Sequence, residues 1–290
     1  MKVATFDAVL KSLNRLDPWL RSLGIEPKSD RWHQAVQMVQ RAKEQREIVE
    51  RGGARVHISN YMDGLFEAME IHEIVEAFDS DSSPALKAKL MRALCGPISP
   101  FNEQPKNSEA RNTMFELSLA ADWKNAGSVV ELGEPDIKLR AAVALFQTEC
   151  KRPFSENSVR KNIGDAASQL AKELNKPDSE NDYGIIAISL SRVFTKGNLG
   201  CYAPAGMGKQ VIGEALAEML DEHTEQWGLK RFREMHPRIV AVMFQLTAPW
   251  DVGGERLIHL STSNFLETGN DARGWNTLRN HVESLEHAVA

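Results

Sequence analysis

The chain has 290 residues, of which 42% are hydrophobic, and this length suits one large or two ordinary domains with a real hydrophobic core. It contains no apolar run of about 18 residues, and an early acid follows the first methionine, so we expect neither a membrane span nor a signal peptide. Its net charge is -5. Its three cysteines are widely spaced and form no Cys-x-x-Cys pair, and this cysteine usage favours a cytoplasmic location and argues against a zinc cluster.

The first hundred residues are predicted to be helical throughout. Their apolar positions recur at helical spacing, and the expected helices cover residues 6–23, 30–51, 60–78 and 83–95. None of these helices carries a pattern that indicates chemistry. We therefore predict an all-helical region over residues 1–100, which could contact a substrate, a partner protein or a second copy of the chain. The proline-containing stretch 96–107 would join it to the rest.

The second region, residues 108–290, begins with a helix predicted over residues 112–123. Glu116 shares one face of this helix with Leu119 and Trp123, which follow it three and seven residues later. Glu116 therefore lies on a stripe that carries large apolar side chains.

A first strand is predicted over residues 128–132, and a bend leads from it to Asp136. The next strand is predicted over residues 142–151, and period-two alternation places one set of side chains on a single face: Val143, Leu145, Gln147, Glu149 and Lys151. A buried charge is unfavourable unless it is paired or binds a metal. Asp136, on an adjacent strand, could complete a cluster of two carboxylates and one ammonium. Such oxygen ligands suit Mg²⁺ or Mn²⁺.

The remaining elements predict an α/β fold. An amphipathic helix over residues 156–174 is followed by an apolar strand over 183–193, and this order implies a central mixed, mostly parallel sheet flanked by helices. The later elements extend and cover the sheet: a helix over 210–222, strands over 238–246 and 257–265, and a helix over 274–289.

An acid two residues before a lysine occurs four times in this chain. The pairs are Glu26/Lys28, Asp122/Lys124, Asp136/Lys138 and Glu149/Lys151. The first lies in a predicted turn and the second at a helix end, so both favour solvated surface charges. Only the last pair ends an apolar strand and follows a Pro-Asp dipeptide at a suitable distance.

Pro135-Asp136 and Glu149-Cys150-Lys151 together resemble the pattern of the restriction-endonuclease-like, or PD-(D/E)XK, nuclease superfamily. The resemblance covers about residues 108–200 and implies a core of helix, strand, strand, strand, helix, strand, within a nuclease domain over residues 108–290. It further implies a hydrolase that cleaves phosphodiester bonds with Mg²⁺ or Mn²⁺. Asp136, Glu149 and the backbone carbonyl of Cys150 would hold the metal, and Lys151 would orient the attacking water.

The resemblance also suggests supporting residues. Many members carry an extra acid on the first helix, which Glu116 would match, although a surface glutamate beside a core stripe is an equal alternative. Several members carry a helix glutamine near the site, which Gln169 would match. The tyrosine that often follows that glutamine four residues later is absent here, since position 173 is Glu173.

Binding of phosphate would depend on local basic groups, because the net charge is acidic. The candidates are Arg152, Arg160, Lys161 and Arg192, although for each of them alone the pattern favours a solvated surface charge. DNA is favoured over RNA as the substrate because most of the resembling family acts on DNA.

Two other hypotheses stay open. The chain could be a non-catalytic binding or regulatory protein on the same fold, with the helical region 1–100 as its interaction module. It could also be a nuclease that a partner or ligand activates, as in bacterial defence against foreign DNA.

Overall fold

The computed structural model describes residues 2–26, 31–50, 62–96, 103–104, 108–141, 144–195, 208–251 and 256–289. The chain forms two compact units and passes between them several times. Unit 1 comprises Met1–Met114, Phe194–Gly213 and Thr247–Thr262, and unit 2 comprises Phe115–Val193, Glu214–Leu246 and Ser263–Ala290. Most of the predicted join over 96–107 and the predicted strand residue Val143 lie outside the described residues.

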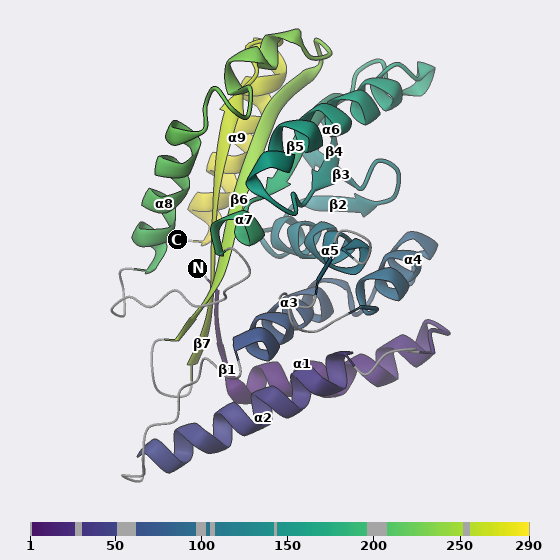
Figure 1. Ribbon diagram of the computed structural model, residues 1–290. Coiled ribbons are helices and arrows are strands. Elements are labelled where there is room, and N and C mark those ends of the chain that lie inside the picture. Colours follow the sequence, from purple (N-terminus) through teal and green to yellow (C-terminus); the bar gives the residue numbers. More distant parts are fainter. Residues whose placement is uncertain are drawn as a thin grey trace. The chain divides into compact units, whose positions relative to one another are not determined.

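Unit 1 contains the predicted N-terminal helices, shown in purple and blue in Figure 1. They are α1 (Phe6–Ser22), α2 (Arg31–Glu50), α3 (Met62–Phe78) and α4 (Pro84–Ala93). The Thr5 side chain caps α1, because its hydroxyl accepts a hydrogen bond from the Ala8 amide at 3.1 Å. α1, α2 and α3 pack against one another. The predicted helical region is thus confirmed as helical.

The prediction that this region is all-helical is wrong at its first residues. Lys2–Thr5 form a strand, β1, which pairs antiparallel with the first residues of β7 (Arg256–Glu267). Four residues are too few to show a periodicity, and the partner strand lies at the other end of the chain. Local sequence therefore gave no signal for β1.

The strands of unit 2 belong to a mixed sheet with the order β1-β7-β6-β5-β4-β3-β2. Besides β1 and β7, the strands of this sheet are β2 (Val129–Leu132), β3 (Ile137–Ala141), β4 (Ala144–Lys151), β5 (Tyr183–Ser189) and β6 (Ile239–Asp251). The pairs β2/β3 and β3/β4 are antiparallel, whereas β4/β5 and β5/β6 are parallel. The Thr268 amide donates to the Val240 carbonyl at 3.1 Å, so the end of β7 meets the start of β6 and these two strands run antiparallel.

The α/β class and the mixed sheet are confirmed, but the expectation of mostly parallel pairing is wrong. Within the described ranges, parallel pairs occur only around β5, because four residues separate β2 from β3 and two separate β3 from β4, which are too few for a crossover. The strand predicted over 183–193 also ends early, at Ser189, and a short helix, α7 (Ser191–Thr195), follows it. None of the helices in the described ranges has the length and apolar character needed to cross a membrane.

Further helices surround these strands. They are α5 (Glu109–Asn125), α6 (Val159–Leu174), α8 (Gly208–Glu222) and α9 (Ala272–Val289), with 3-10 turns η4 (Glu156–Ser158), η5 (Pro177–Ser179) and η6 (Leu229–Glu234). α6 covers one face of the sheet. Its residue Leu174 lies 3.1 Å from the place that a Cβ on Gly184 would occupy, and Gly184 is in register with Gln147 of β4. By alternation, α6 covers the face that carries Gln147, Glu149 and Lys151.

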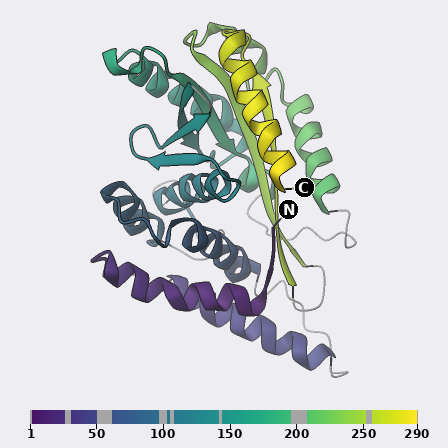
Figure 2. The same cartoon turned by 180° about the vertical axis from the view of Figure 1, so that it is seen from behind.

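α5 and α9 cover the opposite face. Gln245 is in register with Ser189 on that face, and its amide nitrogen lies 3.4 Å from the Asp122 carboxylate of α5. Gly274 of α9 lies so close to Tyr183 that an added Cβ would stand 2.5 Å from the ring. Figure 1 shows α6 in front of the strands, and Figure 2, seen from behind, shows α9 in front of them.

Candidate metal and phosphate site

The end of β4 carries polar side chains in a largely buried setting. Gln147 and Glu149 are 2% and 6% exposed, whereas the side chain of Lys151 is 21% exposed. The Gln147 amide donates to Ser179 at 2.9 Å and to Asp182 at 2.6 Å, so local partners hold it. The exposure of these polar side chains therefore increases toward the carboxyl end of β4, and the three lie on one face, as the alternation predicts.

Asp136 immediately precedes β3. Ile137, the first residue of β3, is paired with Thr148 of β4, and continuing this antiparallel register by one residue brings Asp136 level with Glu149. One Asp136 carboxylate oxygen accepts a hydrogen bond from the Cys150 backbone amide at 2.9 Å. The structure thus brings Asp136 to the backbone between Glu149 and Lys151.

Glu149 and Lys151 form an ion pair, with 2.6 Å between Oε1 and Nζ. Burial raises the pKa of Glu149, and the negative charge of Asp136 raises this pKa further. The hydrogen bond and positive charge of Lys151 lower the pKa in part, so the net pKa stays above its ordinary value. The two carboxylates therefore repel each other, and a cation bound between them would relieve this repulsion.

Glu134 also contributes to this field, and the sequence prediction did not include it. Its charge is a smaller cause of the raised pKa of Glu149. Its side chain is exposed, and it directly precedes Pro135. The position of Glu134 directly before the Pro-Asp dipeptide is the sequence feature that could have indicated its contribution.

Glu116 is half-buried on α5, and that helix covers the face of the sheet opposite Glu149. Among the residues that the structure describes, no group of three or more His, Cys, Asp or Glu side chains is placed to hold a metal ion. Glu116 is therefore not placed as a third ligand beside Asp136 and Glu149. To act as a metal ligand, Glu116 would have to move to the carboxyl end of β4.

Gln169 is exposed on α6, between the buried residues Ala166 and Leu170. Within the described ranges, no hydrogen bond joins it to Asp136, Glu149 or Lys151. Its supporting role stays a prediction. The same holds for the backbone carbonyl of Cys150 as a metal ligand, because the contact shown in the structure is made by the amide of that residue.

The predicted phosphate-binding residues fall into two groups. Arg152 directly follows Lys151 and is half-buried, and Arg192 donates from Nε to the Phe154 carbonyl at 3.1 Å. Arg160 and Lys161 are both exposed at the start of α6, and Lys161 lies 3.5 Å from Asp165 one turn further along. The first pair is tied to the loop after β4, and the second projects from the helix.

Comparisons with protein-family models, with curated proteins and with solved structures found no match for this chain.

Proposed function

We propose that the protein is a metal-dependent nuclease, a hydrolase of phosphodiester bonds, with its site at the carboxyl end of β4. The observation that carries this proposal is the arrangement of Asp136, Glu149 and Lys151. Two carboxylates are held close together, one is buried with a raised pKa, and a lysine stands beside it. Selection for folding stability alone would not favour such a cluster, because two like charges close together in a buried setting destabilise the folded state.

The donor set fits a hard divalent cation. Asp136 and Glu149 would hold Mg²⁺ or Mn²⁺, which bind one or two carboxylates together with water and substrate phosphate. The metal would supply an activated water and neutralise charge on the phosphoryl oxygens. Lys151, as a compact positive charge that is partly desolvated, would orient that water or stabilise the developing charge.

The order of the elements supports the resemblance to PD-(D/E)XK nucleases. α5, β2, β3, β4, α6 and β5 follow one another as helix, strand, strand, strand, helix, strand. A restriction-endonuclease-like core and a DNA substrate are our proposals on this basis. We also propose a cytoplasmic location, because the few separated cysteines suit a reducing compartment.

The second candidate is a non-catalytic binding or regulatory protein on the same fold. One observation favours it: Lys151 lies 2.6 Å from Glu149, so this carboxylate has a positive partner without a metal. The helices of unit 1 would then be the interaction module, for a partner protein or a second copy of the chain. The large apolar side chains of Ile48 in α2 and Met91 in α4 are exposed there, at 46% and 48%.

Cleavage of labelled DNA in Mg²⁺ or Mn²⁺ tests the first proposal. We expect Asp136→Ala and Lys151→Ala each to lower the rate by about a thousandfold or more, since the lost contacts stabilise the transition state by several kcal/mol. Lys124→Ala is the matched control, because Lys124 belongs to the same acid-x-lysine pattern and is also half-buried. It should cleave as the wild type does.

Circular dichroism of each variant establishes that the fold survives. Wild-type rates in both Asp136→Ala and Lys151→Ala would reject the nuclease. If the wild type neither cleaves DNA or RNA nor gives heat with millimolar Mg²⁺ or Mn²⁺ in calorimetry, the binding-protein alternative is favoured.

A further inference from the structure

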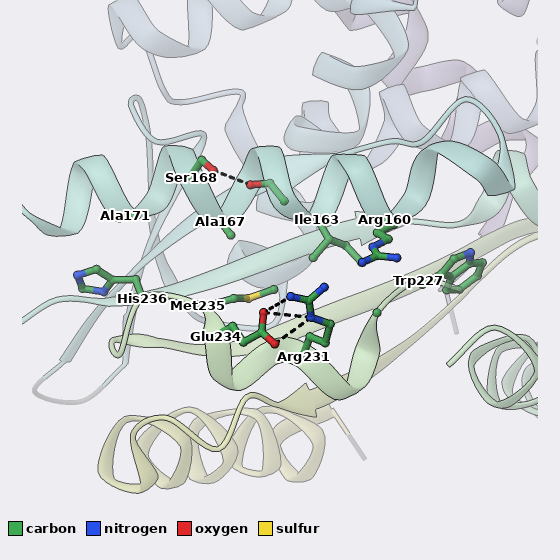
Figure 3. Close-up of a pocket in the computed structure, with 12 residues that line it drawn as sticks. Arg160, Ile163, Ala167, Ser168, Ala171, Trp227, Arg231, Glu234, Met235 and His236 are labelled. Carbon is green, nitrogen blue, oxygen red and sulfur yellow. Dashed lines mark hydrogen bonds and ion pairs between the residues drawn. The ribbon is translucent and has the colours of Figure 1, made fainter. Parts of the chain in front are cut away.

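A groove of about 340 Å³ lies between α6 and η6 in unit 2. Figure 3 shows that α6 forms one wall and the segment from Trp227 to His236 forms the other. The wall on α6 is made of small residues at helical spacing, which leaves the space open: Gly164, Ala167, Ser168 and Ala171. Ile163 and Met235 add apolar surface. The volume suits a ligand of nucleotide size.

Two guanidinium groups enter this groove from opposite walls. Arg160 of α6 lies against Gly228, where an added Cβ would stand 3.6 Å from its Nε atom. Gly228 has φ of 73°, a conformation that glycine adopts easily, and it is the N-cap of η6. Arg231 projects from η6 toward the same space, as Figure 3 shows. The two arginines therefore converge although they are about seventy positions apart in the sequence.

The charges that line the groove are not balanced. Glu234 accepts from the Arg231 Nε atom at 2.9 and 3.0 Å and compensates that arginine. In the described part of the chain, Arg160 has no hydrogen-bond or ion-pair partner, and its charge acts only at longer range to lower the pKa of Glu234. One positive charge is left over, at the end of the groove near the start of α6.

His236 closes the far end of the groove as a neutral group. Burial lowers the pKa of His236, and the charge of Arg238 lowers it further. Its Nδ1 atom accepts from the Arg238 amide at 3.2 Å, and its Nε2 atom lies 3.2 Å from the Asn175 side-chain oxygen. The groove thus has one cationic end and one neutral, largely apolar end.

We propose that this groove binds one nucleotide unit, with its phosphate on Arg160 and Arg231 and its base against the apolar surface of Ile163 and Met235. Planar guanidinium groups suit phosphate oxygens, and apolar side chains accept the face of any base. The identification of the ligand as nucleic acid rests on the proposed function. β4 ends at Lys151, and α6 begins at Val159 and packs against β4, so Arg160 belongs to the helix turn that follows the carboxyl end of β4.

Binding of a fluorescent single-stranded oligothymidylate of about ten nucleotides, in EDTA so that no cleavage occurs, tests this inference. We expect Arg160→Ala to weaken binding about tenfold and to lower the slope of log affinity against log salt by about 0.7, the loss of one phosphate contact. Lys172→Ala is the control, since Lys172 is an exposed cation on the same helix that does not line the groove. It should change the affinity by less than about twofold.

A second experiment, competition by thymidine monophosphate, distinguishes binding of a free nucleotide from binding of a nucleic-acid strand. If it competes with the oligonucleotide in the wild type and not in Arg160→Ala, the groove takes single nucleotides; if Arg160→Ala affects only the oligonucleotide, the groove takes a strand. Equal losses in Arg160→Ala and Lys172→Ala, or no loss in either, would overturn the inference. Cleavage that still depends on Lys151 would then show that the proposed function stands without it.

Discussion

Unit 1 and unit 2 each contain a buried cluster of charged side chains, and the two clusters are built differently. In unit 1, Glu67 of α3 lies between Arg31 at 2.7 Å and Arg111 at 3.7 Å. The three side chains are 0%, 1% and 4% exposed. In unit 2, the side chains of Glu149 and Lys151 are 8% and 21% exposed.

The difference lies in charge balance as well as in access. Glu67 has two guanidinium partners, and Arg31 also donates to the Ala93 and Cys95 carbonyls at 2.8 Å, so this cluster is enclosed and compensated. Glu149 pairs with Lys151, and the negative charge of Asp136 acts on Glu149 as well. An enclosed, compensated cluster stabilises one packing arrangement, whereas a half-open cluster in which two carboxylates repel each other has capacity for a cation. Burial of charge alone therefore does not identify a functional site.

The largest expected effect concerns the structural cluster. Glu67→Gln would remove the buried carboxylate charge that lies 2.7 Å from Arg31 and 3.7 Å from Arg111, and it should lower the free energy of unfolding by about 3–5 kcal/mol. Chemical denaturation measures this. Glu76→Gln is the control on the same helix, because Glu76 pairs with Arg15 at 3.1 Å while about half exposed, and it should lower stability by at most about 1 kcal/mol. Equal losses in the two variants would contradict the structural role of Glu67.

The second effect concerns the candidate metal site. Mn²⁺ at a hundred times its Kd should stabilise the wild type by about 2.7 kcal/mol, because only the folded chain holds both carboxylates together. Glu149→Gln should abolish this stabilisation. Glu173→Gln removes the same charge from a surface pair with Lys176 and should keep it. Thermal unfolding with and without the metal gives the comparison, and an equal response of both variants would exclude Glu149 as a ligand.

Much of the fold could be predicted from the sequence because it depends on local pattern. Helical spacing located the helices of unit 1 to within a few residues, and alternation placed Gln147, Glu149 and Lys151 on one face of β4. The resemblance of Pro135-Asp136 and Glu149-Cys150-Lys151 to the nuclease pattern led to the prediction that an adjacent strand brings Asp136 alongside Glu149. These features follow from neighbours that are close in the sequence.

The remaining features depend on contacts between distant segments. The pairing of β1 with β7 and the antiparallel order around β3 could not be derived from periodicity. The spacing of Glu116 shows that it lies on an apolar stripe, but spacing cannot show which face of the sheet α5 covers. Arg231 was overlooked for the same reason, since only the fold brings η6 to α6.

The third effect is a pH dependence in metal-free buffer. The pKa of Glu149 is raised in the folded state above its ordinary value of 4.5, so the folded chain holds this proton to a higher pH than the unfolded chain does. Stability from this residue is therefore present below pH 4.5 and is lost as the pH rises through the raised pKa. Glu149→Gln cannot titrate, so the wild type should lose stability relative to this variant as the pH rises. A constant difference across the titration would show that the pKa of Glu149 is not raised.

The smallest expected effect concerns Thr148, a buried polar residue of β4 on the face opposite the candidate metal site. Thr148 stands between Gln147 and Glu149, faces the opposite side of the sheet, and is fully buried. Within the described residues, its hydroxyl has no hydrogen-bond partner. A buried hydroxyl without a partner is unfavourable, so the isosteric change Thr148→Val should raise the free energy of unfolding by about 1 kcal/mol. Because its side chain points away from Asp136 and Glu149, the stabilisation by Mn²⁺ should stay at its wild-type size. If Thr148→Val instead weakened the response to Mn²⁺, the two faces of β4 would be coupled, and the candidate site would extend through the sheet toward α5 and Glu116.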